Sequence, residues 1–224
     1  MNLEARRFPR WTRRVLRDHG FSKENTIAVV VTCRDEICSD VLRWVERSWG
    51  EAFDGRSLAG MAWLGRTGLS AALAHAPTQG GRVRLVVVHL AHIGMDPTAG
   101  LTCRGDLCVP TCGALAKLFG EEDFDGTIKV SDPEQTLLKL RIGQLYQKGT
   151  PRPKTLVDLT RLAQLIGFTD LQVQLRELAQ PMACDYALFS GILEHHPTMQ
   201  TVVLRHARVM VGGEDIQLLE EPDS

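Results

Sequence analysis

The chain has 224 residues and a formal net charge of −1 at pH 7. That length suits a single domain with a substantial core, and the near-neutral charge excludes a field strong enough to recruit nucleic acid or an anionic membrane surface. No apolar stretch follows the basic residues near Met1, and no run approaches the roughly 18 apolar residues of a membrane span, so we expect a soluble cytoplasmic protein without a signal peptide.

The first half of the sequence alternates predicted helices and strands. An amphipathic helix is expected at residues 10–19, closed by Gly20, and the β-branched apolar run at 27–32 predicts a fully buried strand. A helix at 36–49, a short strand at 58–64, a small-residue helix at 69–76 and a strand at 82–89 follow. Such alternation is typical of right-handed crossovers, so we expect an α/β fold with a mostly parallel sheet flanked by helices.

The second half predicts further helices and an edge strand. Residues 95–109 are expected to form a loop, and helices are expected from Cys112 to Phe119, at 133–145 and at 156–178, the last with a break near Gly167. A late strand or hairpin is expected at 201–204 and 207–211. We expect one domain over residues 1–224, with an N-terminal helical arm over 1–25 and a flexible acidic tail over 213–224.

Six cysteines in a chain without a predicted signal peptide favour thiols or metal ligands over a disulfide framework. Cys33 ends the first buried strand, His92 follows the third strand, and Cys112 opens the next helix, whose N-terminus is expected to lower the pKa of the thiol. Two thiolates and one imidazole leave a fourth zinc position for water, which is the open arrangement of a catalytic site. The alternative is that these are ordinary buried residues without a metal, because the spacing between them is long, unlike that of a compact CxxC pair.

Four groups of residues occur in order along residues 10–119. They are Cys33-Arg34-Asp35-Glu36, Gly65-Arg66-Thr67-Gly68 with Ala74-His75-Ala76-Pro77, His92-Ile93-Gly94 and Cys112-Gly113-Ala114-Leu115. The sequence resembles the limiting-CO2-inducible protein B/C family, the theta-class carbonic anhydrases with a β-carbonic-anhydrase-like fold. This resemblance implies a Zn²⁺ site formed by Cys33, His92 and Cys112, an Asp-Arg dyad that orients a zinc-bound hydroxide, and a homodimer.

Asp35 is the expected carboxylate of the dyad, because it lies two residues after Cys33, as in β-class enzymes. The β-class pattern places the arginine two residues further on, where this chain has Ile37. Arg66, in a glycine-flanked turn, is therefore the first choice, and Arg34 is disfavoured because its side chain should leave the strand on the face opposite Asp35.

Secondary roles are assigned to residues around this site. His75 or His89 is expected to shuttle the proton, and Arg104 to meet the anion. Cys103 and Cys108 either form a reversible disulfide or remain idle thiols. Core positions are expected for Cys38 and Cys184. A surface loop is expected for His195 and His196, with a second metal contact as the alternative.

We therefore expect a carbonic anhydrase, a zinc lyase that interconverts CO2 and bicarbonate. The alternative is a non-catalytic zinc-binding scaffold, or a CO2/bicarbonate-responsive partner protein, of the same fold. A third hypothesis is a redox-sensing thiol protein that uses Cys103 and Cys108.

Overall fold

The computed structural model describes residues 1–77, 82–94, 101–104, 107–110, 112–121, 131–179, 181–196 and 198–219; of 101–104 and 107–110 it describes the backbone alone. Its centre is a seven-stranded mixed sheet with the order β1-β8-β7-β4-β2-β3, and β9 also pairs with β8. The strands β3, β2, β4 and β7 run parallel, whereas β8 pairs antiparallel with β7, β1 and β9. The sheet strands are β1 (Asn2–Glu4), β2 (Thr26–Thr32), β3 (Ala52–Asp54), β4 (Val83–Gly94), β7 (Cys184–His195), β8 (Gln200–Val211) and β9 (Glu214–Gln217).

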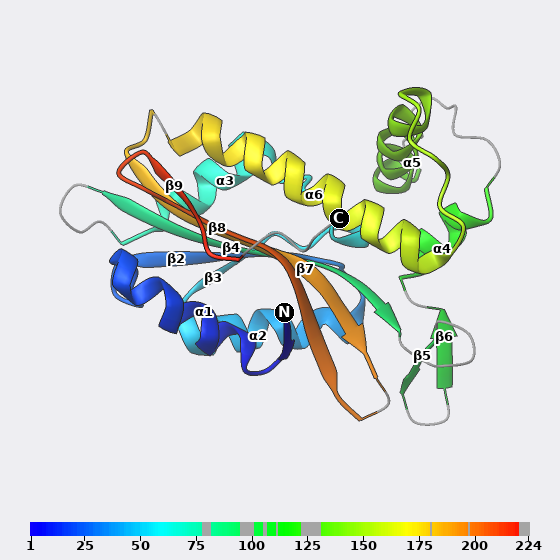
Figure 1. Cartoon of the computed structure of the whole chain (residues 1–224), viewed down its shortest axis with the longest axis horizontal. Helices are drawn as coiled ribbons and strands as arrows, with labels where there is room; N and C mark the ends of the chain where they lie inside the picture. The colour runs from blue at the N-terminus through cyan, green and yellow to red at the C-terminus, as the bar shows by residue number, and fades with distance from the viewer. Residues whose placement is uncertain are drawn as a thin grey trace.

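Helices cover both faces of this sheet. Figure 1 shows α1 and α2 on one side and α3 and α6 on the other. None of the helices in the described ranges is long and apolar enough to cross a membrane. The helices are α1 (Phe8–Leu16), α2 (Ser39–Trp49), α3 (Gly65–Ala74), α4 (Gly113–Phe119), α5 (Pro133–Gln147) and α6 (Leu156–Ala179), with 3-10 helices at Arg17–His19, Glu36–Cys38 and Leu58–Gly60.

The central strands are apolar because both of their faces are buried. Every residue of β2 is buried, and ten of the twelve residues of β4 are buried. The side chains divide into two hydrophobic clusters, with Val30 and Val88 on one face and Val29 and Val87 on the other. Because β2, β4 and β7 are parallel, the residues that follow or end them meet at one edge of the sheet.

The predicted α/β fold with a mostly parallel core flanked by helices is confirmed. The strand predicted at 58–64 is wrong: Leu58–Gly60 forms a 3-10 turn in which Ala59 has a φ of 57°, and the short strand lies earlier, at β3. The loop predicted at 95–109 contains a two-stranded hairpin, β5 (Leu101–Arg104) and β6 (Leu107–Pro110), while residues 95–100 and 105–106 lie outside the described residues.

Other differences lie in the C-terminal half. The central strand β7 was not predicted, and the two late segments at 201–204 and 207–211 form one strand, β8. Part of the segment expected to be a flexible acidic tail, residues 214–217, forms β9, and residues 220–224 lie outside the description.

The helix break predicted near Gly167 is wrong, because α6 runs through this position. A Cβ atom at Gly167 would lie 2.4 Å from Nε2 of His89 on β4. The glycine therefore permits a close approach between helix and sheet instead of ending the helix.

Candidate metal centre

Cys33, His92 and Cys112 lie together, although 79 residues separate the first from the last. One ligand atom of each lies within 4.8 Å of the others, and the exposed fractions of the three residues are 4%, 0% and 1%. The Sγ atoms of Cys33 and Cys112 are 4.0 Å apart. Two thiolates on one tetrahedral zinc ion lie ~3.8 Å apart, so the two sulfur atoms are spaced closely enough to share such an ion.

Each of the three residues is held by a different element. Cys33 follows β2 and forms an isolated parallel bridge with Ser57, and His92 is the third residue from the end of β4. Cys112 is the N-cap of α4, with φ 34° and ψ 90°. This backbone conformation is costly for a non-glycine residue, and such strain is concentrated at functional sites.

The two neighbouring thiols shift each other's pKa in opposite directions. The hydrogen bond from Cys112 lowers the pKa of Cys33, although burial opposes this change, and the ring of His92 and the backbone N–H of Asp35 lower it further. The Cys33 sulfur and burial together raise the pKa of Cys112, and the backbone N–H of Leu115 at the start of α4 opposes this only weakly. The predicted lowering of the Cys112 pKa by the helix is therefore wrong, because the neighbouring thiolate outweighs the helix N-terminus.

His92 fits a metal better than it fits a core histidine. Both of its ring nitrogens are buried, and neither has a hydrogen-bond partner among the described residues. An imidazole buried in this way normally finds a partner, because an unpaired polar atom costs about 1–3 kcal/mol. The donor set of two thiols and one imidazole is the kind that binds zinc.

A second group of potential ligands shares His92. Cys38, His92 and His195 also offer ligand atoms within 4.8 Å of one another, and all three residues are buried. The core position expected for Cys38 is confirmed, whereas His195, expected in a surface loop or as a second metal contact, is buried. His195 ends β7, and the register that pairs His92 with Leu193 puts His195 on the same face of the sheet as His92.

The three dyad candidates lie in different places. Asp35 is half-buried, and its Oδ1 accepts a hydrogen bond of 3.3 Å from the backbone N–H of Ile37. The guanidinium of Arg34 forms an ion pair of 2.7 Å with Glu134 on α5. Arg66 lies on α3, with its exposed guanidinium 3.9 Å from Glu177 of α6. The structure therefore brings neither arginine into a recorded contact with Asp35.

Arg56 is a further candidate that the sequence does not single out, and the charges of the buried thiols affect its pKa. It precedes Ser57, whose backbone pairs with Cys33, and its guanidinium makes a bidentate contact with Asp54. The hydrogen bond with Asp54 raises the pKa of Arg56, and the Cys38 and Cys33 sulfur atoms raise it further. No sequence signal marked Arg56, because the parallel pairing of β3 with β2 positions it.

The remaining candidates are distributed as follows. His75 is exposed at the end of α3. His89 is fully buried, with Nε2 donating to the carbonyl of Gly60 and Nδ1 lying 2.7 Å from Ser190 Oγ, and burial lowers its pKa to about 4. Cys184 is a buried free thiol on β7. Arg104, Cys103 and Cys108 lie in β5 and β6, where the two cysteines are register partners and the side chains are outside the described part.

The fold and the two groups define an α/β protein with a buried Cys/His cluster that could bind a metal ion. Residues 3–210 match the family model described as limiting CO2-inducible proteins B/C beta carbonic anhydrases. The chain belongs to this family. The fold is accordingly β-carbonic-anhydrase-like.

Solved structures share this fold. The crystal structure of limiting CO2-inducible protein LCIB is 23% identical, with a TM-score of 0.81 over 97% of this chain and 94% of that chain. The crystal structure of PtLCIB4, a homolog of LCIB, is 17% identical, with a TM-score of 0.75 over 96% and 94% of the two chains. No curated protein matches the chain.

Proposed function

We propose that this protein is a zinc-dependent carbonic anhydrase that hydrates CO2 reversibly to bicarbonate. The observation that carries the proposal is the convergence of Cys33, His92 and Cys112 in a buried group, within a chain that belongs to a family described as β carbonic anhydrases. These three residues would hold the Zn²⁺. The homodimer expected from the family resemblance stays a prediction.

Zinc bound by these residues would acidify water and so supply the nucleophile for CO2 at neutral pH. Cys33 and Cys112 would bind it as thiolates, which leaves little net positive charge at the site. The lowered pKa of Cys33 supports this role, because it favours the thiolate form that binds zinc. The Cys112 thiol must lose its proton when the metal binds.

Asp35 is the proposed orienting carboxylate. Its Oδ1 already accepts one hydrogen bond from the backbone N–H of Ile37, which fixes the carboxyl group at the start of the 3-10 helix Glu36–Cys38 and leaves further acceptor positions on the carboxylate. A nearby guanidinium would keep Asp35 ionised and turned away from direct metal ligation. Arg66 as that guanidinium stays a prediction, and Arg56 is a second candidate because the Cys38 and Cys33 sulfur atoms contribute to its raised pKa.

The experiment that tests the proposal measures zinc content and CO2 hydration on the same preparations. The wild-type protein is expected to contain bound zinc and to hydrate CO2 in a stopped-flow pH-indicator assay. Cys33→Ser and Cys112→Ser are expected to lose zinc and at least ~100-fold of the activity, because each removes a ligand from a three-residue site.

Cys184→Ser is the matched control, since Cys184 is also a buried free thiol but lies outside both groups. It is expected to keep zinc and activity. Circular dichroism checks that all variants fold. Full activity in Cys33→Ser would refute the proposed chemistry, whereas bound zinc without CO2 hydration in the wild type would favour the non-catalytic scaffold.

A further inference from the structure

The group formed by Cys38, His92 and His195 has the composition of a metal site of its own. The Sγ atom of Cys38 lies 3.9 Å from Nε2 of His195, and the exposed fractions of these two residues are 0% and 4%. A thiolate and an imidazole on one zinc or cobalt ion lie ~3.6–3.8 Å apart for tetrahedral to trigonal geometry. The observed separation therefore allows one ion between them after a small contraction.

The ring of His92 connects this group to the first one. A metal-bound histidine almost always uses its second ring nitrogen to donate to a carboxylate, a carbonyl or water. His92 has no such partner among the described residues, and both of its nitrogens are unpaired. The ring packs edge-on against that of His195, with ring centroids 5.4 Å apart. The ring carries two nitrogens, so a bridging role would use one nitrogen for each group of ligands.

Gln200 is placed to set the tautomer of His195. Its side-chain amide lies 3.0 Å from Nδ1 of His195, and its Oε1 is buried without a hydrogen-bond partner in the described part of the chain. The same amide nitrogen donates to the carbonyl of Ile37 at 3.1 Å, so Nδ1 of His195 accepts from Gln200 and the proton of the neutral ring lies on Nε2, facing Cys38. A metal ion bound at Nε2 would take the place of this proton. The ring proton would then move to Nδ1, and the Gln200 amide would turn over and give up its bond to Ile37 so that Oε1 accepts it.

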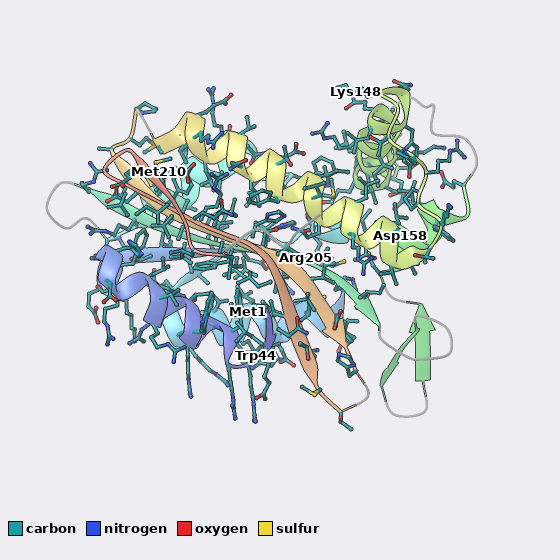
Figure 2. The ribbon with its side chains drawn as sticks, in the orientation of Figure 1. Met1, Trp44, Lys148, Asp158, Arg205 and Met210 are labelled. Carbon is teal, nitrogen blue, oxygen red and sulfur yellow. The ribbon has the colours of Figure 1, made fainter. Side chains whose placement is uncertain are left out.

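An entry route lies on the outer side of the group. A surface cavity of about 880 Å³ lies between the start of α2 and the β7–β8 hairpin, and His195 and Gln200 line it. Trp44, labelled on α2 in Figure 2, forms part of the wall. Metal sites need such an access path, and this one reaches His195 without passing Cys33 or Cys112.

We propose that Cys38, His195 and the second ring nitrogen of His92 form a second site for a thiophilic divalent ion such as Zn²⁺, bridged by His92 to the first site. This inference rests on the proposed function for the occupancy of the first site. When both sites are filled, His92 binds as imidazolate, so the second ion displaces one proton from the His92 ring and one from the Cys38 thiol.

The test is a titration of the metal-free full chain with Co²⁺, followed by elemental analysis after loading with Zn²⁺. Thiolate-to-cobalt absorption is expected to rise over two equivalents, and the second equivalent adds about half as much as the first, because one thiolate binds instead of two. Cys38→Ser and His195→Ala are expected to bind one ion, and Cys112→Ser is expected to keep the second ion. Cys184→Ser, the control, binds two.

The outcomes separate this site from the proposed function. One ion in the wild type and in Cys38→Ser, with none in Cys112→Ser, overturns the second site and leaves the first intact. One ion that is lost in Cys38→Ser but kept in Cys112→Ser upholds the second site and overturns the proposed function. A second equivalent that binds equally well to Cys38→Ser and His195→Ala also refutes the inference.

Discussion

Among single residues, the identity of the arginine that serves Asp35 depends on where the candidate side chains lie. Arg66 was preferred from the sequence because a glycine-flanked turn exposes it, and the structure places it on α3 beside Glu177. Asp35 belongs to the segment that leads into α2, on the other face of the sheet. Arg56 and Asp35 both influence the pKa of Cys38, which burial chiefly raises, so the two side chains lie around the same thiol.

We predict that Arg56→Gln lowers kcat/KM for CO2 hydration by roughly 10–100-fold while zinc content stays unchanged. The physical reason is that a positioned charge near the reacting group is removed and the ligands are not. Arg66→Gln is measured beside it, because the variant with the larger loss of kcat/KM identifies the arginine that serves Asp35. Stopped-flow assays at several CO2 concentrations measure both variants, and the reverse ranking would reinstate Arg66.

At the scale of elements, the contact between α6 and β4 explains a glycine that resembles a helix breaker. Gly167 is buried inside α6 and faces the ring of His89. His89 is in turn fixed by Gly60 and Ser190, and Gln164 of α6 donates to Ser190 Oγ at 2.7 Å. The ring therefore has no room to retreat from an added methyl group.

Gly167→Ala is expected to lower the free energy of unfolding by about 2 kcal/mol. Alanine improves helix propensity by about 1 kcal/mol, but its Cβ would lie 2.4 Å from His89 Nε2, and overpacking of this kind outweighs the gain. Urea denaturation measures the change. Thr169→Ala, an exposed position on the same helix, is the control and should shift the free energy by less than about 0.5 kcal/mol. A stabilised Gly167→Ala variant would contradict the packing argument.

At the scale of the whole molecule, buried neutral His89 couples global stability to pH. Its pKa is lowered from 6.5 to about 4 by burial, so between these values the unfolded chain binds a proton that the native chain does not. Stability from this group is complete above about pH 6.5 and is lost as the pH falls toward 4, because the unfolded state is favoured wherever it binds more protons.

We predict that His89→Gln, which keeps hydrogen-bonding capacity without titrating, destabilises the protein more at pH 7.5 than at pH 4.5. The difference between the two destabilisations should be about 2 kcal/mol, from the proton that only the wild-type unfolded state gains at His89. Paired urea titrations of wild type and variant at both pH values provide the measurement. Loss of bound metal at low pH affects both proteins and cancels in the comparison. An equal cost at the two pH values would show that His89 does not titrate on unfolding.

Local sequence patterns predict the strand–helix alternation, the buried strands β2 and β4, and Cys33, His92 and Cys112 as candidate ligands. These patterns are runs of β-branched residues, helical spacing, and the positions that follow parallel strands. The place of β7 depends on the tertiary fold, because Ser190 and Gly191 interrupt its strand signal. The positions of Arg56 and His195 depend on it as well, because the bridge between Cys33 and Ser57 positions the first and the pairing of β4 with β7 positions the second. Local sequence constrains backbone conformation, but which side chains share a buried pocket depends on register across the sheet, and no short window of residues contains that information.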